Sequence, residues 1–321
     1  MDLPTIIIRE EKQMAEEKKT TLIAVDHGFS HIKTVDEIFE TAITPIDEPI
    51  SGKNVLQIGP KYYRIGGRRI DVLEDKTATD EFRLLTYVAI ARQLAHLNTK
   101  KASITLAVGL PIGRLAKEKA AFKKYLASPK EVHFHYSESA YVITIENVFV
   151  FPQCYGAVAN LIPEMQSEEV VVDIGSWTID TLYITRHTPD ESRCGSDPNG
   201  LIPCFRRIDE ECMKQYNTKL GETLIEDVIR GSAKGVEDKY ITLIRDNLTR
   251  YTKNVFHVLR EMGIRVKTTP ITFTGGGALL MKKYAGLKDK NISYIDDIRA
   301  NARGYDALAR AFLKGRGIAC L

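Results

Sequence analysis

The stretch VVVDIGSWTIDTLYI, residues 170–184, decides the fold of this chain. Its three valines are β-branched and apolar, which is typical of a strand buried on both faces, and Asp173 ends that strand. Gly175 has no Cβ, so the backbone can turn there with several N–H groups directed into one small space. The residues from Thr178 to Ile184 then predict an antiparallel return strand. The hairpin places a carboxylate beside backbone amides, an arrangement that suits a phosphate chain with its divalent cation.

The same plan occurs a second time near the start of the chain. Residues 22–33, LIAVDHGFSHIK, read as an apolar strand, an Asp-x-Gly turn at Asp26 and Gly28, a small polar residue and a return strand. A third glycine turn, residues 275–277, follows the strand ITFT and precedes the apolar run ALLM. A single Asp-x-Gly is more often only a tight hairpin, so the inference depends on its repetition.

Length and composition bound the class of protein. A chain of 321 residues is long enough for two domains, and we expect two lobes. A hydrophobic share of 44% is ordinary for a globular protein, and no apolar run approaches the roughly 20 residues that span a bilayer. The net charge of +3 comes from 45 basic and 42 acidic residues, a balance that does not indicate direct DNA binding.

The cysteines and the N-terminal residues give expectations about the compartment. Five cysteines, an odd number with no Cys-x-x-Cys pair, signal neither a disulfide framework nor a zinc site. Only residues 6–8 form an apolar run before the charged residues 9–19, which is not the pattern of a signal peptide. We therefore expect a cytoplasmic protein in which residues 1–19 form a solvated extension.

The rest of the chain alternates strand and helix patterns, which predicts an α/β protein with mixed sheets. Asp80 can cap the first long helix, residues 189–199 read as a polar loop, and Gln153 lies at a strand-to-helix junction. A linker near residues 163–167 marks the predicted boundary between the lobes. The further predicted strands are 53–58, 61–65, 102–108, 132–135, 140–151 and 271–274, and the predicted helices are 82–97, 114–126, 155–161, 205–216, 222–230, 236–262 and 297–312.

The ordered set of two Asp turns, a Gln-bearing junction and a late triple glycine resembles the actin-like ATPase superfamily, whose two-lobed fold is a duplicated ribonuclease H-like unit. Within it the chain is most similar to the plasmid-segregation actins of the ParM (StbA) type. The segments AVGLP at 107–111, NVFVFP at 147–152 and NARG at 301–304 support this, and the likeness covers residues 20–317. It implies domain I at 20–163 plus 299–321 and domain II at 164–298, after the 1–19 extension.

The resemblance also implies a nucleotide site for ATP or GTP with Mg²⁺. Asp26 and Asp173 would hold the hydrated metal, Lys33 would contact the β- and γ-phosphates, and Gln153 would orient the attacking water. Gln153, Asp173 and Asp26 are thus the implied catalytic residues. The implied nucleotide-binding residues are Gly28, Phe29, Ser30 and Lys33 of the first turn, Gly175, Ser176, Trp177 and Thr178 of the second, Gly275, Gly276 and Gly277 of the adenosine loop, and Asn301.

Three positions differ from the family pattern, and a fourth has two possible roles. Gln153 stands where ParM-type actins carry Glu, and a neutral amide can position water but cannot take its proton, so we expect slow hydrolysis. We expect His27 to be a solvent-facing turn residue and Trp177 to pack between the lobes. Asp180 either supports the attacking water through a neighbour or is an ordinary strand residue.

The function that the resemblance implies is a filament-forming ATPase that segregates plasmid copies by polymerisation and hydrolysis-driven disassembly. Its partners would be further copies of itself and a DNA-binding adaptor at a centromere-like site. One alternative is an actin-like scaffold of the divisome or pilus type that binds nucleotide without useful hydrolysis. Another is a small-molecule kinase of the same fold, for which only Asp180 could serve as a base near the γ-phosphate.

Overall fold

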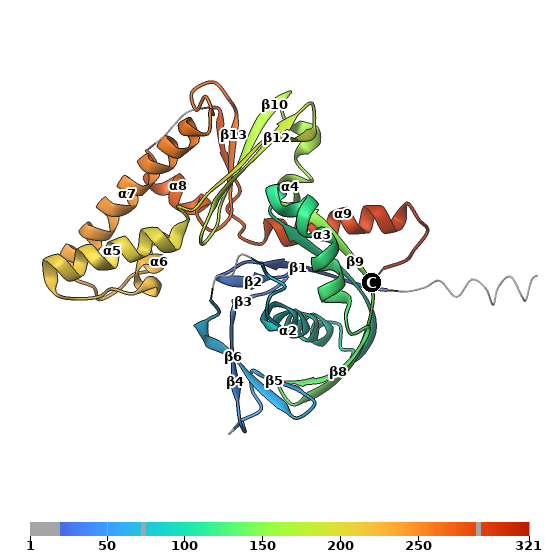
Figure 1. Ribbon diagram of the computed structural model, residues 1–321. Coiled ribbons are helices and arrows are strands. Elements are labelled where there is room, and N and C mark those ends of the chain that lie inside the picture. The colour runs from blue at the N-terminus through green and yellow to red at the C-terminus, as the bar shows by residue number, and fades with distance from the viewer. Residues whose placement is uncertain (1–19, 50, 72–74, 287–289, 321) are drawn as a thin grey trace, which may run out of the picture.

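Two mixed β-sheets with helices on their faces make up the protein (Figure 1). The structure, a computed structural model, describes residues 20–49, 51–71, 75–286 and 290–320. The predicted extension 1–19 lies outside the described residues. All strands before residue 163 belong to one sheet and all strands after it to the other, so the predicted domain boundaries stay a proposal consistent with this arrangement.

The first sheet has nine strands in the order β3-β2-β1-β7-β9-β8-β5-β6-β4. It curls around helix α2 (Glu81–His96), as the lower part of Figure 1 shows. The strands are β1 (Thr21–His27), β2 (His31–Lys33), β3 (Ile38–Glu40), β4 (Ala42–Ile46), β5 (Val55–Ile58), β6 (Lys61–Arg69), β7 (Lys101–Leu110), β8 (Glu131–Tyr136) and β9 (Ser139–Pro152).

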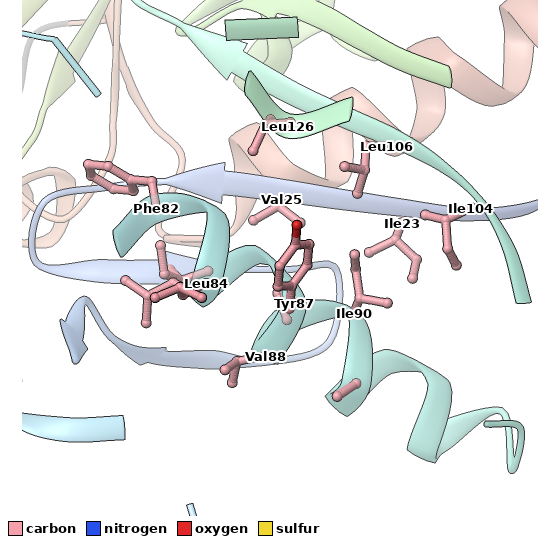
Figure 2. Close-up of a cluster of buried hydrophobic side chains, with 14 of the residues drawn as sticks. Ile23, Val25, Phe82, Leu84, Tyr87, Val88, Ile90, Ile104, Leu106 and Leu126 are labelled. Atoms are coloured by element: carbon pink, nitrogen blue, oxygen red, sulfur yellow. The ribbon is translucent and has the colours of Figure 1, made fainter. Parts of the chain in front are cut away.

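Helix α2 is apolar around most of its circumference, because the sheet surrounds it. A helix with apolar residues on every side is one that a core encloses, and its buried residues include Phe82, Tyr87 and Leu94. Side chains of β1 and β7 point at it from the sheet, among them Ile23 and Leu106 (Figure 2). Asp80 precedes the helix as predicted, but its side chain makes no capping hydrogen bond. Its carboxylate instead accepts a bond from Arg83.

The opposite face of the first sheet is covered by α9 (Ala300–Lys314). Neighbouring residues of a strand point to opposite faces, so Leu22 and Ala24 of β1 contact α9 while Ile23 and Val25 contact the α2 core. Ala24 and Ala107 are small, which lets α9 lie close to the strands. Strand β1 is thus buried on both faces, as its continuous apolar run predicts.

The second sheet has five strands in the order β12-β11-β10-β13-β14. Val170 and Val172 of β10 face a core formed with the helices α5 to α8, whereas Val171 faces α4 and η1 on the other side. The elements are α4 (Tyr155–Val158), η1 (Ile162–Glu164), β10 (Glu168–Ile174), β11 (Ile179–Thr185), β12 (Thr188–Asp197), α5 (Leu201–Tyr216), α6 (Glu222–Arg230), α7 (Asp238–Glu261), β13 (Ile271–Thr274), α8 (Ala278–Tyr284) and β14 (Ile292–Tyr294).

The two sheets share one five-strand arrangement. In the first, β3-β2-β1 are antiparallel neighbours and β1-β7-β9 are parallel ones. In the second, β12-β11-β10 are antiparallel and β10-β13-β14 are parallel. Strands β1 and β10 therefore occupy equivalent central places, and each is followed by an Asp-turn hairpin. The two similar sequence stretches lie at equivalent positions of a duplicated architecture.

Two predicted elements differ from the structure. Residues 189–197 of the predicted polar loop belong to strand β12, which begins at Thr188 and pairs antiparallel with β11. It lies at the sheet edge and is largely exposed, so it has no apolar alternation to mark it. Helix α4 ends at Val158 rather than near 161, and η1 follows it. Helix α3 (Ile112–Ala127) flanks β9, and no helix in the described ranges combines the length and hydropathy needed to cross a membrane.

Candidate functional site

The first Asp turn joins β1 to β2 and holds a buried ion pair. Asp26 and Lys33 are direct partners in the antiparallel register, so their side chains extend on the same face of the hairpin. The Lys33 ammonium donates to Asp26 Oδ2 at 2.9 Å, and Asp26 is only 2% exposed. Burial alone would raise the pKa of Asp26, but the ammonium of Lys33 outweighs it and holds that pKa below its usual value.

Both Asp turns leave three consecutive backbone N–H groups without an acceptor in the described part of the chain. In the first turn these are the amides of residues 28–30, and in the second those of residues 176–178. The second turn is held from behind by α5, because Leu201 N–H donates to Gly175 O at 3.0 Å and Ile202 N–H donates to Ser176 O at 2.8 Å. The carbonyls are occupied while the amides stay available, which is the arrangement that binds an anion.

Asp173, at the end of β10, is a buried carboxylate with few compensating groups. Burial raises its pKa to about 6, the neighbouring carboxylates Asp180 and Asp26 add to the shift, and the Lys33 ammonium opposes it. Asp180 is its direct partner on β11, and the Thr178 hydroxyl donates to Asp180 at 2.7 Å. A cation placed between Asp26 and Asp173 would therefore be stabilised by both.

Asn301 ties Asp173 to the first residues of α4. Its Nδ2 donates to Asp173 Oδ2 at 2.9 Å, while its Oδ1 accepts from the backbone N–H groups of Cys154 and Ala157, each at 3.1 Å. Gln153 immediately precedes these amides and donates through Nε2 to Asp26 Oδ1 at 3.2 Å. The two carboxylates are thus connected through side chains at one strand-to-helix junction.

The glycine turn after β13 makes room for Asp173. Gly275 has a φ of +80°, and a Cβ there would lie 2.0 Å from Asp173 Oδ1, so only glycine fits. Gly276 borders the same space. Gly277 differs from the prediction, because a Cβ there would meet the Ile174 side chain at 2.3 Å and its N–H donates to Ile174 O at 3.0 Å. It serves the packing of α8 rather than the lining of the site.

A single cleft between the two sheets brings the predicted residues together. It is lined by residues of the first turn, the second turn, the glycine turn and the chain before α9. Of the predicted site residues it includes Asp26, Gly28, Phe29, Ser30, Lys33, Gln153, Asp173, Gly175, Ser176, Trp177, Thr178, Gly275, Gly276 and Asn301, and not Gly277.

Comparisons with known proteins agree with this arrangement. Residues 24–156 match the family model described as Actin like proteins N terminal domain. The solved structure of Ta0583, an archaeal actin homolog, in complex with ADP has a TM-score of 0.69 at 21% identity and covers 91% of this chain and 100% of its own. The chain has the actin-like fold.

Two further actin-like structures are similar over nearly the whole chain. The apo psk41 ParM protein has a TM-score of 0.69 at 18% identity, covering 94% of this chain and 99% of its own. A ParM filament structure from Clostridium botulinum has a TM-score of 0.70 at 19% identity, covering 92% and 100%. No curated protein matches the chain. The predicted fold and the predicted resemblance to ParM-type proteins are confirmed at the level of the fold.

The structure corrects the expectation for His27 in the actin-like first turn. His27 is fully buried, not solvent-facing, because β1 continues through it and directs its ring toward α2. The Thr86 hydroxyl donates to Phe82 O at 2.7 Å, so His27 Nε2 donates to that hydroxyl at 2.7 Å. Burial lowers the pKa of His27 to about 3, and the ring is neutral.

Trp177 and Lys76 complete the cleft wall. The Trp177 ring lines the cleft, and the guanidinium of Arg206 on α5 lies 4.9 Å from its centroid. Lys76, which no sequence motif marks, is 4% exposed and also lines the cleft. Burial lowers its pKa to about 8. A lysine in a polar loop ahead of a helix gives no signal in the sequence, and only the fold brings it to the first turn.

Proposed function

We propose that the chain is a Mg²⁺-dependent nucleoside triphosphatase that assembles into filaments, with ATP or GTP as its substrate. One observation carries this proposal: two turns on separate sheets each present a carboxylate and three unpaired amides to one cleft. The amides would hold phosphate oxygens from both sides of the cleft. The ADP complex of the archaeal homolog and the ParM filament from Clostridium botulinum support nucleotide binding and self-association.

The residues present fit a magnesium ion held together with phosphates. Among the described residues no group of three or more His, Cys, Asp or Glu side chains could hold a metal by itself. Mg²⁺ usually keeps several waters and takes one or two carboxylates together with substrate phosphates, and Asp26 and Asp173 supply those two carboxylates. When bound, the ion would neutralise negative charge on the phosphates. The raised pKa of Asp173, caused first by burial, is consistent with a carboxylate that lacks a full counter-charge of its own.

The reaction we propose is transfer of the terminal phosphoryl group to water. Catalysis of this kind is mostly positioning and charge stabilisation. Lys33 would contact the phosphates while staying paired with Asp26, and the Gln153 amide, held against Asp26, would orient the water. The Gln153 amide is neutral and cannot take a proton from that water, so we expect turnover to be slow.

The cellular role that we propose is segregation of plasmid copies, with filaments that disassemble after hydrolysis and a DNA-binding adaptor at a centromere-like site. The ParM likeness supports it. The nearly balanced charge of the chain, with a net of +3, fits contact with DNA through an adaptor rather than directly. The alternative is an actin-like scaffold that binds nucleotide without useful turnover, since the same cleft could serve it.

Light scattering and phosphate release, followed in parallel on the purified chain after addition of ATP or GTP with Mg²⁺, test the proposal. A rise in scattering followed by phosphate release is expected. Scattering without phosphate release would favour the scaffold, and turnover that needs a small acceptor would favour a kinase. Asp173→Ala should abolish phosphate release, whereas the exposed Asp246→Ala on α7 should not change it. Normal release in Asp173→Ala would contradict the assigned role.

A further inference from the structure

Lys76 places a buried ammonium directly behind the first Asp turn. Its Nζ donates to the His27 carbonyl oxygen at 2.5 Å, between Asp26 and Gly28 in the chain. The ammonium also lies 5.3 Å from the ring centroid of Phe29 and 5.4 Å from that of Phe82. These contacts fix the cation at the inner wall of the cleft, although it belongs to a loop far from the turn in sequence.

The other cations of the cleft form ion pairs, whereas Lys76 forms none with the residues that the structure describes. Lys33 is paired with Asp26 at 2.9 Å, Arg114 with Glu118 at 2.6 Å and Arg230 with Glu226 at 2.9 Å. Lys76 has no carboxylate within ion-pair distance in the described ranges.

An ammonium has three N–H donors, and among the described residues the single acceptor for Lys76 is the His27 carbonyl. Asp26 is within electrostatic reach of Lys76 but is already paired with Lys33, so two buried cations share one carboxylate and a further anion would stabilise this position.

The location of Lys76 tells which anion would fit. The first turn carries three unpaired amides on the cleft side, and the second turn carries three more across from it. Asp180, next to the second turn, is itself within electrostatic reach of Lys76 and Arg114. The ammonium therefore borders the part of the cleft between the two turns, where our proposed function puts the end of the phosphate chain.

We propose that Lys76 binds the terminal phosphoryl group of a bound nucleoside triphosphate and holds the free phosphate after hydrolysis. This inference rests on the proposed function and adds a cationic residue that the sequence motifs do not contain. The shared ligand chemistry is a tetrahedral phosphate with oxygens available to two or more N–H donors. A charge-assisted hydrogen bond of this kind is about twice as strong as a neutral one, and it is absent for a diphosphate. Lys76 is thus a specificity-determining residue for triphosphate over diphosphate.

The test compares binding of a non-hydrolysable triphosphate analogue and of ADP, each with Mg²⁺, by the full chain and three variants. Lys76→Met keeps an apolar stem against Phe29 and Phe82 without the charge, Lys76→Arg keeps the charge, and Lys119→Met removes an exposed lysine from α3. We expect Lys76→Met to weaken binding of the analogue at least about tenfold and of ADP less than about twofold. Lys119→Met should change neither, and Lys76→Arg should retain most of the preference.

A second experiment, with orthophosphate, tests whether Lys76 also binds free phosphate and not only the terminal phosphoryl group of the nucleotide. Phosphate added with ADP should raise the melting temperature of the wild type beyond the effect of ADP alone, and this increment should vanish in Lys76→Met. Equal loss of analogue and ADP binding, or no loss at all, would overturn the inference. If the wild type binds no nucleotide, the proposed function fails. The role of Lys76 is then tested by orthophosphate alone: a rise in melting temperature that disappears in Lys76→Met supports an anion site at Lys76, and no such rise refutes it.

Discussion

Replacing Asn301 by alanine removes the side chain that joins the two halves of the site. In the structure this amide makes three hydrogen bonds, one to Asp173 Oδ2 at 2.9 Å and one each to the N–H groups of Cys154 and Ala157 at 3.1 Å. Asn301 is 7% exposed, so its partners lie away from bulk water. The alanine variant leaves all three partners in place without the groups that satisfy them.

The expected loss of stability follows from those partners. A hydrogen bond to a charged carboxylate contributes about 1.5–3 kcal/mol, and a buried N–H left without an acceptor costs about 1–3 kcal/mol. Water entering the vacated space from the cleft can satisfy part of this, so the lower ends of the ranges apply. We expect Asn301→Ala to reduce the free energy of unfolding of the nucleotide-free protein by about 3–4 kcal/mol.

Urea unfolding at pH 7.5 measures this loss. The exposed Asn160→Ala, which follows α4, is the control and should change the free energy of unfolding by about 0.5 kcal/mol or less. A double-mutant cycle with Asp173→Ala isolates the single contact and should give a coupling of about 1.5–3 kcal/mol. A loss below about 1 kcal/mol, or a coupling near zero, would refute the reasoning, because Asn301 would then not be the connection between the sheets.

Three further predictions concern the same region. Gln153→Ala should lower the rate of phosphate release by about 10²-fold, as expected for a group that positions the nucleophile, with nucleotide affinity little changed in a binding titration. A Cβ on Gly304 would lie 1.7 Å from Gly156 O, so Gly304→Ala should destabilise the protein in thermal unfolding by about 1–3 kcal/mol or more. Gly113→Ala, where a Cβ meets nothing within 4 Å, is its control. His27 has a folded pKa of about 3, below its unfolded value near 6.5, so only the unfolded state takes up this proton between those values. The contribution of His27 to stability should therefore fall by about 2 kcal/mol from pH 7 to pH 5. It is measured as the difference between the wild type and a His27→Asn variant, because Asp173, whose pKa is raised to about 6, titrates in both proteins and changes stability in the opposite direction.

The turns of the site could be predicted because their signals are local. Asp26 and Asp173 each end an apolar strand, and a glycine two residues later permits the turn. The carboxylate and the residue that allows the turn therefore lie within one short segment of sequence. Gln153 is similarly visible as the residue between a strand pattern and a helix pattern. These local signals, taken with their order in the chain, support the resemblance to the actin-like fold, whereas the expectation of two lobes comes from the chain length.

The remaining features depend on contacts between distant segments. His27 was expected at the surface, because an Asp-x-Gly turn does not show that β1 extends one residue further and directs that ring into α2. Lys76 lies 49 positions after the carbonyl that its ammonium meets, and no pattern near it predicts that approach. Strand β12 is polar because it forms an exposed edge, so periodicity cannot separate it from a loop.

Helices α4 and α9 pack backbone against backbone. Gly156 of α4 and Gly304 of α9 meet with no room for a Cβ, and a Cβ on Gly109 would lie 2.0 Å from the Tyr305 hydroxyl. Backbones this close cannot slide past one another without a clash, so α4 and α9 are held in one relative position.

On the side of the cleft away from α4 and α9, where Figure 1 shows β6 and α6, the sheets are joined by an ion pair between Arg69 and Glu222 at 2.5 Å. Both side chains are about a third exposed, at 31% and 37%, and such a pair contributes little to stability. This ion pair is therefore a weak link between β6 and α6. A ligand that bridges the amides of both turns, as we propose for a nucleoside triphosphate, would add contacts between the two sheets, and the bond from Asn301 to Asp173 would hold the second turn in position for it.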